Sequence, residues 1–168
     1  MLFERYYPDG YARNAYAIDY KDLYNRGYRG IIFDIDNTLV PHDAPATAKA
    51  ALLVRKLKKT GFRVMIVSNN KEPRVRSFAQ GVNGGYVFRA GKPGRRGYLE
   101  AVDKMGLARE RVIVIGDQLF TDIWGANRSG LHSLLVGRIS FREPPHIHLK
   151  RVLEWPIRLA YRLRSLKV

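Results

Sequence analysis

The stretch GIIFDIDNT, residues 30–38, decides the fold class. Its first part is a short apolar run ending in the carboxylate of Asp34, which is typical of a strand buried on both faces of a parallel sheet. Alternation along extended backbone would place Asp34 and Asp36 close together on one side, with Ile35 turned away. Two crowded carboxylates are costly unless a cation or a shared proton compensates them. The end of this strand therefore predicts a site for a hard divalent cation, magnesium above all.

Further apolar runs follow along the chain and alternate with segments of helical length. This alternation predicts an α/β fold in which a central, mainly parallel sheet lies between two layers of helices, a three-layer sandwich. The expected strands are 30–34, 62–68, 85–89, 112–116 and 131–136. The expected helices are 45–60, 72–80, 94–105 and 120–129.

Charge and composition narrow the class of protein. The chain of 168 residues carries 30 Lys and Arg against 15 Asp and Glu, a formal net charge of +15 at pH 7, and has no cysteine. The surplus favours a polyanionic partner, namely nucleic acid, an anionic membrane surface or a phosphorylated substrate, over a merely solvated cationic surface. The absence of cysteine excludes disulfides and cysteine nucleophiles. Without a membrane-spanning run or a secretory signal, we expect one cytoplasmic domain over 1–168.

Polar groups that suit phosphate chemistry follow four of the expected strands. Because ligands of parallel α/β sheets bind where the carboxyl ends of the strands meet the loops, these groups are expected to share one site. After the second strand, Ser68 and Asn69 offer a hydroxyl and an amide to phosphate oxygens. Lys92 follows the third strand and offers a cation to developing negative charge. Asp117 follows the fourth strand and is placed to complete a metal shell.

At these positions the chain resembles a known superfamily. DIDNT at 34–38 matches the first motif, Asp-x-Asp-x-Thr, of the haloacid dehalogenase (HAD) phosphatases, and GDQLFTD at 116–122 resembles the fourth. Ser68 and Lys92 lie where the second and third motifs of that superfamily belong. The order of PDGYARNAYAIDY, GIIFDIDNTLV and a basic tail resembles the YqeG-like branch, subclass III. The resemblance thus covers almost the whole chain.

The resemblance implies a magnesium-dependent phosphatase with an aspartyl-phosphate intermediate. Asp34 would attack phosphorus, and Asp36 would protonate the leaving oxygen and then activate the hydrolytic water. Mg²⁺ would be held by Asp34, the backbone carbonyl of Asp36 and Asp117, with Asp122 as a direct or outer partner. The residues expected to bind the transferring phosphoryl group are Ser68, Asn69 and Lys92.

The spacing of the motifs leaves no room for a cap domain. Segments 35–67 and 69–91 each hold only one expected helix and one expected strand. The site should therefore be open, with a cationic rim formed by Lys71, Arg74, Arg89, Arg95 and Arg96. An open mouth of this kind suits a phosphate on a large or membrane-presented molecule. The resemblance suggests phosphatidylglycerophosphate as this molecule, because phosphatidylglycerophosphate phosphatases are relatives of the YqeG-like branch. Another phosphorylated metabolite or a nucleic-acid end is the alternative substrate.

The two ends of the chain carry separate expectations. The arm 1–29 holds seven of the ten tyrosines and is expected to form a lid or a packing arm. The segment 143–168 is basic and amphipathic, and Pro156 is expected to end one helix and begin another. Its apolar face would either pack on the core or lie peripherally on a membrane of anionic phospholipid. The apolar positions are Leu149, Val152, Leu153, Trp155, Ile157, Leu159, Ala160, Leu163 and Leu166, opposite Lys150, Arg151, Arg158 and Arg162.

A basic protein that binds RNA or a ribonucleoprotein through a vestigial active site is the competing hypothesis. A phosphatase that has lost its activity would be expected to lose at least one of its motif residues as well, and this chain keeps all of them. Basic proteins that bind single strands also interleave aromatic residues with cations on one sheet face, and the expected strands do not. The sequence therefore favours the phosphatase.

Overall fold

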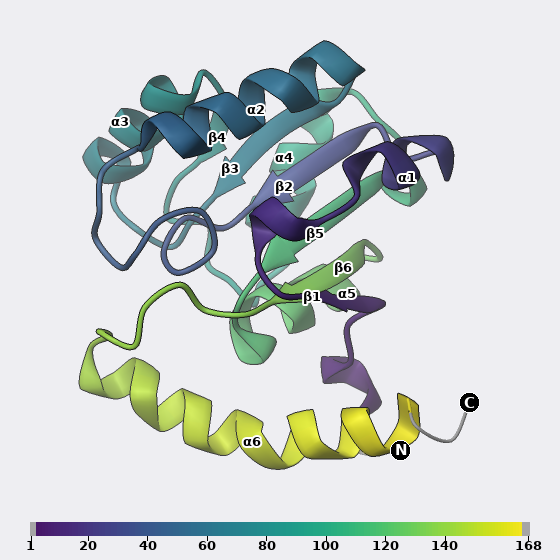
Figure 1. Ribbon diagram of the computed structural model, residues 1–168, viewed down its shortest axis with the longest axis vertical. Helices are drawn as coiled ribbons and strands as arrows, with labels where there is room; N and C mark the ends of the chain where they lie inside the picture. The colour runs from purple at the N-terminus through teal and green to yellow at the C-terminus, as the bar shows by residue number, and fades with distance from the viewer. Residues whose placement is uncertain (1–2, 166–168) are drawn as a thin grey trace.

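The computed structural model describes residues 3–165, whose centre is a six-stranded sheet with all strands parallel (Figure 1). The strand order is β1-β6-β5-β2-β3-β4. The strands are β1 (Gly10–Ala12), β2 (Gly30–Phe33), β3 (Arg63–Val67), β4 (Gly85–Val87), β5 (Val112–Gly116) and β6 (His132–Val136). Because β2 pairs with both β3 and β5, the strand that leads into Asp34 lies in the middle of the sheet.

Helices cover both faces of this sheet and complete a three-layer sandwich (Figure 1). One face is covered by α1 (Tyr20–Asn25), α2 (Ala48–Thr60) and α3 (Glu72–Val82), and the other by α4 (Arg96–Met105) and α5 (Trp124–Arg128). Short helical turns join these elements: η1 (Glu4–Tyr6), η2 (Ala15–Ala17), η3 (Arg109–Arg111) and the π-helical turn η4 (Leu119–Ile123). The predicted α/β architecture is confirmed, and within residues 3–165 the segments between the motifs form only the elements of this sandwich.

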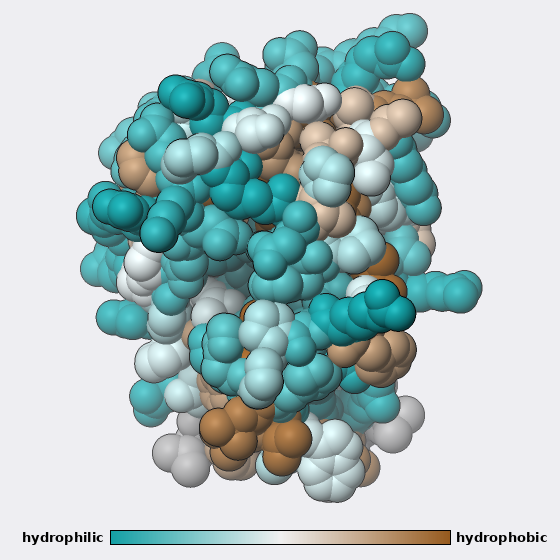
Figure 2. Space-filling view, turned by 90° about the vertical axis from the view of Figure 1, so that its left-hand side faces the viewer, coloured by the Kyte–Doolittle hydropathy of each residue, from teal (hydrophilic) through white to brown (hydrophobic). Residues whose placement is uncertain are grey.

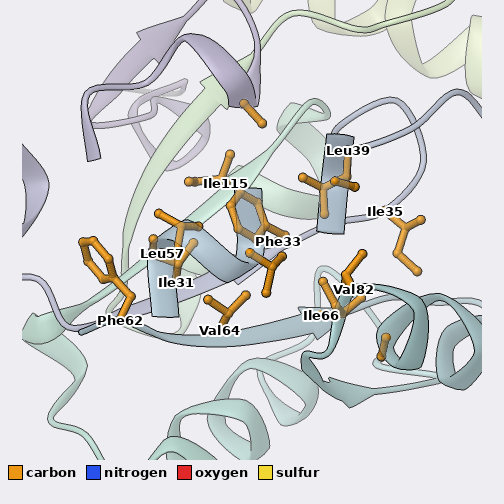
Figure 3. Packing of buried hydrophobic residues seen from close by; sticks show 14 of the residues in the cluster. Ile31, Phe33, Ile35, Leu39, Leu57, Phe62, Val64, Ile66, Val82 and Ile115 are labelled. Carbon is orange, nitrogen blue, oxygen red and sulfur yellow. The ribbon is translucent and has the colours of Figure 1, made fainter. Parts of the chain in front are cut away.

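The core fixes β2 from both sides. Ile31 and Phe33 point into the cluster under α2 and α3 (Figure 3), whereas Ile32 points into the cluster under α4, as alternation along a strand requires. All three side chains are at most 1% exposed. Burial of each contributes roughly 1.5–3 kcal/mol of stability. The strand end that carries Asp34 is thereby held rigidly.

Two short elements differ from the prediction. The tyrosine-rich arm contributes a strand, since β1 pairs with β6 at the edge of the sheet. The expected helix 120–129 is divided into the π-helical turn η4 and α5. In η4 the backbone N–H groups of both Asp122 and Ile123 donate to the carbonyl of Gln118, which widens the turn.

The C-terminal segment forms one helix, α6 (Pro145–Ser165), so the predicted break at Pro156 is wrong. Pro156 lies on the exposed side of α6, where water can serve the carbonyl that loses its N–H partner. The helix runs beside β1 and β6, outside the sandwich (Figure 1), and Ile157 packs there against Leu119 and Leu135. Within residues 3–165, no helix combines the length and apolar character that crossing a membrane requires.

Candidate active site

The residues predicted to carry the chemistry gather at the carboxyl edge of the sheet. Asp34 directly follows β2, and its N–H continues the ladder by donating to the carbonyl of Ile115 at 3.1 Å. Ser68 follows β3, and its N–H donates to the carbonyl of Val87 at 3.1 Å. The loop after β4 carries Lys92, and Asp117 follows β5.

A buried lysine joins two of the carboxylates. The Nζ atom of Lys92 lies 2.7 Å from Oδ1 of Asp34 and 2.7 Å from Oδ1 of Asp122. The Lys92 side chain is only 4% exposed. Burial favours its neutral amine, but the carboxylates of Asp122 and Asp34 outweigh burial and raise the pKa of Lys92 well above its usual value. Lys92 is therefore a permanent cation facing Asp34.

The carboxylates at this edge are short of positive charge. Burial raises the pKa of Asp34 well above its usual value, although Lys92 opposes the shift. Burial, together with the neighbouring Asp122, also raises the pKa of Asp117 to about 6, against the effect of Arg151. The hydroxyl of Thr38 donates to Oδ1 of Asp117 at 3.1 Å. Raised pKa values of this kind show that the ionised forms lack full compensation.

The donor set fits a hard divalent cation. One carboxylate oxygen from each of Asp34, Asp117 and Asp122 lies within 4.8 Å of the others. All three donors are oxygens, which Mg²⁺ prefers, and a cation there would offset the burial and the like-charge repulsion that raise the pKa values of Asp34 and Asp117. Asp36 belongs to a different group, with His42 and Asp43.

The expected crowding of Asp36 against Asp34 is not what the structure shows, because the two carboxylates have different partners. Oδ1 of Asp36 accepts from the N–H of Asp43 at 2.8 Å and from Arg74 at 3.1 Å, and Oδ2 accepts from Asn70 at 2.9 Å. The reason is local: β2 ends at Phe33, so the alternation that would align the two side chains does not continue.

Ser68 and Asn69 are placed differently within the second motif. Ser68 is 2% exposed, and its Oγ accepts from the N–H of Asn70 at 3.2 Å. The Asn69 side chain instead brackets the backbone of Lys92, accepting from its N–H at 2.7 Å and donating to its carbonyl at 3.1 Å. Asn69 thus positions the loop of Lys92.

The C-terminal segment contributes an ionic network that was not predicted from the sequence. Arg151 of α6 forms ion pairs with the carboxylates of Asp117 and Glu143, and its Nη1 donates to the Asp117 carbonyl at 2.8 Å. Glu143, whose side chain is 1% exposed, also accepts from Nδ2 of Asn37 at 2.8 Å. The network therefore links α6 to the first and fourth motifs at once.

A second set of contacts from α6 binds the loop that follows β5. Nη2 of Arg158 donates to the Asp117 carbonyl at 2.9 Å and to Glu154 at 3.0 Å, and Glu154 accepts from the N–H of Phe120 at 3.2 Å. The site is capless, but α6 closes one side of it. Of the expected cationic rim, Arg74 is engaged with Asp36, whereas Lys71, Arg89, Arg95 and Arg96 are exposed.

Two relatives of known name match most of the chain. A protein of Bacillus subtilis (strain 168), described as the probable phosphatase YqeG, is 41% identical over 137 residues, 81% of this chain and 80% of that protein. The Arabidopsis thaliana protein named phosphatidylglycerophosphate phosphatase 1, chloroplastic/mitochondrial, is 28% identical over 141 residues. These cover 77% of this chain but 40% of the Arabidopsis protein, so the chain spans less than half of that relative.

Family and fold comparisons agree with these relatives. A HAD-hydrolase-like family model matches residues 89–154. The structure of an uncharacterized protein from Listeria monocytogenes serotype 4b superposes with a TM-score of 0.54 at 15% identity, over 70% of this chain and 85% of that one. A hypothetical protein from Xanthomonas campestris gives 0.53 at 19% identity over 73% of each chain, and both show the fold alone. Because the identity to the Bacillus subtilis phosphatase extends over most of both chains, this chain belongs to the YqeG-like family of HAD phosphatases.

Proposed function

We propose that the protein is a magnesium-dependent phosphomonoester hydrolase that works through an aspartyl-phosphate on Asp34. The observation that carries this proposal is the placement of Asp34 at the end of the central strand, 2.7 Å from Lys92 and in one cluster with Asp117 and Asp122. A nucleophilic carboxylate needs a fixed position and a nearby cation to accept a phosphate group, and this arrangement provides both.

The metal site follows from the same cluster. Asp34 and Asp117 would hold Mg²⁺ together with the backbone carbonyl of Asp36, and Asp122 would be a direct or outer partner. When bound, the ion would neutralise negative charge on the phosphate group. The Thr38 hydroxyl, which donates to Asp117, holds that carboxylate in place.

The chain's own residues would do the rest of the chemistry. An oxygen of Asp34 attacks phosphorus while Lys92 and the Ser68 hydroxyl bind the oxygens of the transferring group. Asp36 gives a proton to the leaving oxygen and later takes one from the hydrolytic water. Because Asp36 is engaged by Arg74 and Asn70, its side chain must turn toward the substrate before it can act in this way.

For the substrate, we propose a phosphomonoester presented at a membrane, such as phosphatidylglycerophosphate. The activity for which the Arabidopsis relative is named supports this choice, as do the capless site and the exposed cations Lys71, Arg95 and Arg96 beside it. The substrate would be anionic, and a positively charged entrance raises its local concentration. Binding of nucleic acid stays a prediction from net charge, because no contact of the described residues favours it over a lipid.

The experiment that tests this proposal is phosphate release from phosphatidylglycerophosphate in anionic vesicles, with and without Mg²⁺. Release that requires Mg²⁺ and disappears in Asp34→Asn is the expected result. If the protein hydrolyses an aryl phosphate through Asp34 but leaves the lipid intact, the chemistry holds and the lipid assignment fails. If it hydrolyses neither, the proposed function is wrong.

The role of Asp36 has its own test, which uses the leaving group. A general acid contributes about 10²–10⁴-fold to the rate, and its contribution is largest when the leaving oxygen is basic. Asp36→Asn should therefore slow hydrolysis of an alkyl phosphate far more than that of a nitrophenyl phosphate. Equal slowing of both substrates would show that Asp36 only supports the loop through Asp43 and Arg74.

A further inference from the structure

The outward face of α6 carries an apolar stripe that residues 3–165 leave uncovered. Its residues recur at the three- and four-residue spacing of one helix face, and among the described residues each of the following is between 43% and 69% exposed. They are Leu149, Val152, Leu153, Trp155, Leu159 and Leu163. Figure 2 shows apolar side chains gathered at the lower end of the molecule, where α6 lies, under a mostly hydrophilic surface. Leu166, also expected on this face, lies outside the described residues.

This stripe cannot serve as the packing face of α6, because the opposite face already anchors the helix. Arg151 and Arg158 bind Asp117, Glu154 is fully buried, and Ile157 is 4% exposed against the core. Rotation of the helix to bury the stripe would break every one of these contacts. Of the expected apolar face, Ile157 packs on the core, but the six residues of the stripe do not, and the stripe remains available to a partner.

A cationic pocket lies at the edge of the stripe. A cavity of about 220 Å³ is lined by Arg138, Arg151, Trp155 and Arg158. The Arg151 guanidinium is already bound to Asp117 and Glu143, whereas Arg138 and Arg158 each contact the protein through one terminal nitrogen. The remaining N–H groups of Arg138 and Arg158 form a site for a phosphate or phosphodiester, which arginine binds with its planar fork of donors. Trp155 belongs both to this pocket and to the stripe, so anion-binding and apolar surfaces are continuous.

We propose that α6 docks on the surface of an anionic phospholipid bilayer. The stripe enters the boundary between headgroups and acyl chains, and the arginine pocket takes a lipid phosphate. A tryptophan next to arginines at the rim of an apolar helix face suits the level of the headgroups. A formal net charge of +15 attracts the chain to an anionic surface and opposes pairing of two copies through the same face. This proposal does not rest on the phosphatase chemistry.

The test is binding of the full chain to vesicles, measured by sedimentation. Equal parts of phosphatidylglycerol and phosphatidylcholine provide the anionic surface, and pure phosphatidylcholine is the neutral control. We expect Val152→Asp to weaken binding to anionic vesicles at least about tenfold, because Val152 is 69% exposed and would place a charge in the apolar boundary. The matched control is Leu52→Asp, an exposed leucine on α2, which should bind as the wild type does. Both variants should hydrolyse a soluble aryl phosphate at the wild-type rate.

Two further measurements test the arginine pocket and the alternative that a second copy of the chain covers the stripe. Arg138→Gln should also weaken binding to anionic vesicles, and Trp155 fluorescence should shift to the blue on binding in the wild type but not in Trp155→Phe. Wild-type affinity of Val152→Asp for vesicles would overturn the proposal. The proposal would also be overturned if the wild type did not bind vesicles and instead formed a dimer in analytical ultracentrifugation that Val152→Asp dissociates. A second copy of the chain would then cover the stripe.

Discussion

Arg151 joins α6 to the active site, and its removal gives the sharpest test of the structure. In Arg151→Gln the buried carboxylates of Asp117 and Glu143 lose their shared cation; their side chains are 0% and 1% exposed, and that of Arg151 is 12% exposed. Breaking a buried ion pair by removing one partner costs about 3–5 kcal/mol. We expect the free energy of unfolding in urea, measured without metal, to fall by about that amount.

Mg²⁺ should recover part of this loss. In the wild type Arg151 competes for the Asp117 carboxylate, so the variant should gain more stability from the ion than the wild type does. A ligand at 100 times its dissociation constant stabilises by about 2.7 kcal/mol. Arg162→Gln, at an exposed arginine of the same helix, is the control and should change stability by less than about 0.5 kcal/mol. If Arg151→Gln unfolds within about 1 kcal/mol of the wild type without metal, the reasoning on the network is refuted.

Three further substitutions test the site itself. Lys92→Met leaves Asp34 without its facing cation, and we expect the rate of phosphate release to drop at least about 100-fold. The circular dichroism spectrum should show that the fold is retained. Gly116→Ala would place a Cβ 2.4 Å from Asp122 Cγ, which should cost about 1–3 kcal/mol in urea unfolding and impair phosphate release. Burial raises the pKa of Asp117 from 3.8 to about 6, so the folded chain binds more protons there than the unfolded chain. The metal-free protein should therefore lose stability as pH rises from about 4 to about 6. Because the pKa of Asp34 is raised as well, the slope should become smaller in Asp117→Asn without vanishing, and a slope as steep as that of the wild type would contradict this assignment.

The central strands and the chemistry at their ends could be predicted because their signals are local. Apolar runs placed β2, β3, β5 and β6 to within about two residues, and the runs of β2, β3 and β5 lead directly into Asp34, Ser68 and Asp117. The edge strand β1 could not be found in the same way. It is three residues long, Gly10–Ala12, and exists only because β6 offers it a parallel partner far along the chain.

The ionic network around Arg151 could not be predicted from the sequence, for a different reason. Asn37 and Glu143 are 106 positions apart, and nothing in either neighbourhood indicates the other. Arg151 was assigned to the cationic face of an amphipathic helix, which is correct, but that face was expected to meet solvent or lipid. Hydropathy alone cannot say that a charged face turns inward, because Asp117 and Glu143, which bind Arg151, lie just after β5 and in a distant loop.

The orientation of α6 shows which interaction decides the placement of a helix beside an active site. Burying exposed leucines such as Leu149 and Leu153 against the core would each contribute roughly 1.5–3 kcal/mol, yet the chain leaves both more than half exposed. What the helix gains instead is a guanidinium on the carboxylate and carbonyl of Asp117, a residue whose buried charge would otherwise be poorly compensated. A helix that places charge inside and apolar side chains outside departs from the pattern of a packing helix, and such departures concentrate where function demands them. The inner face of α6 therefore serves the site, and its outer face is free to serve a surface.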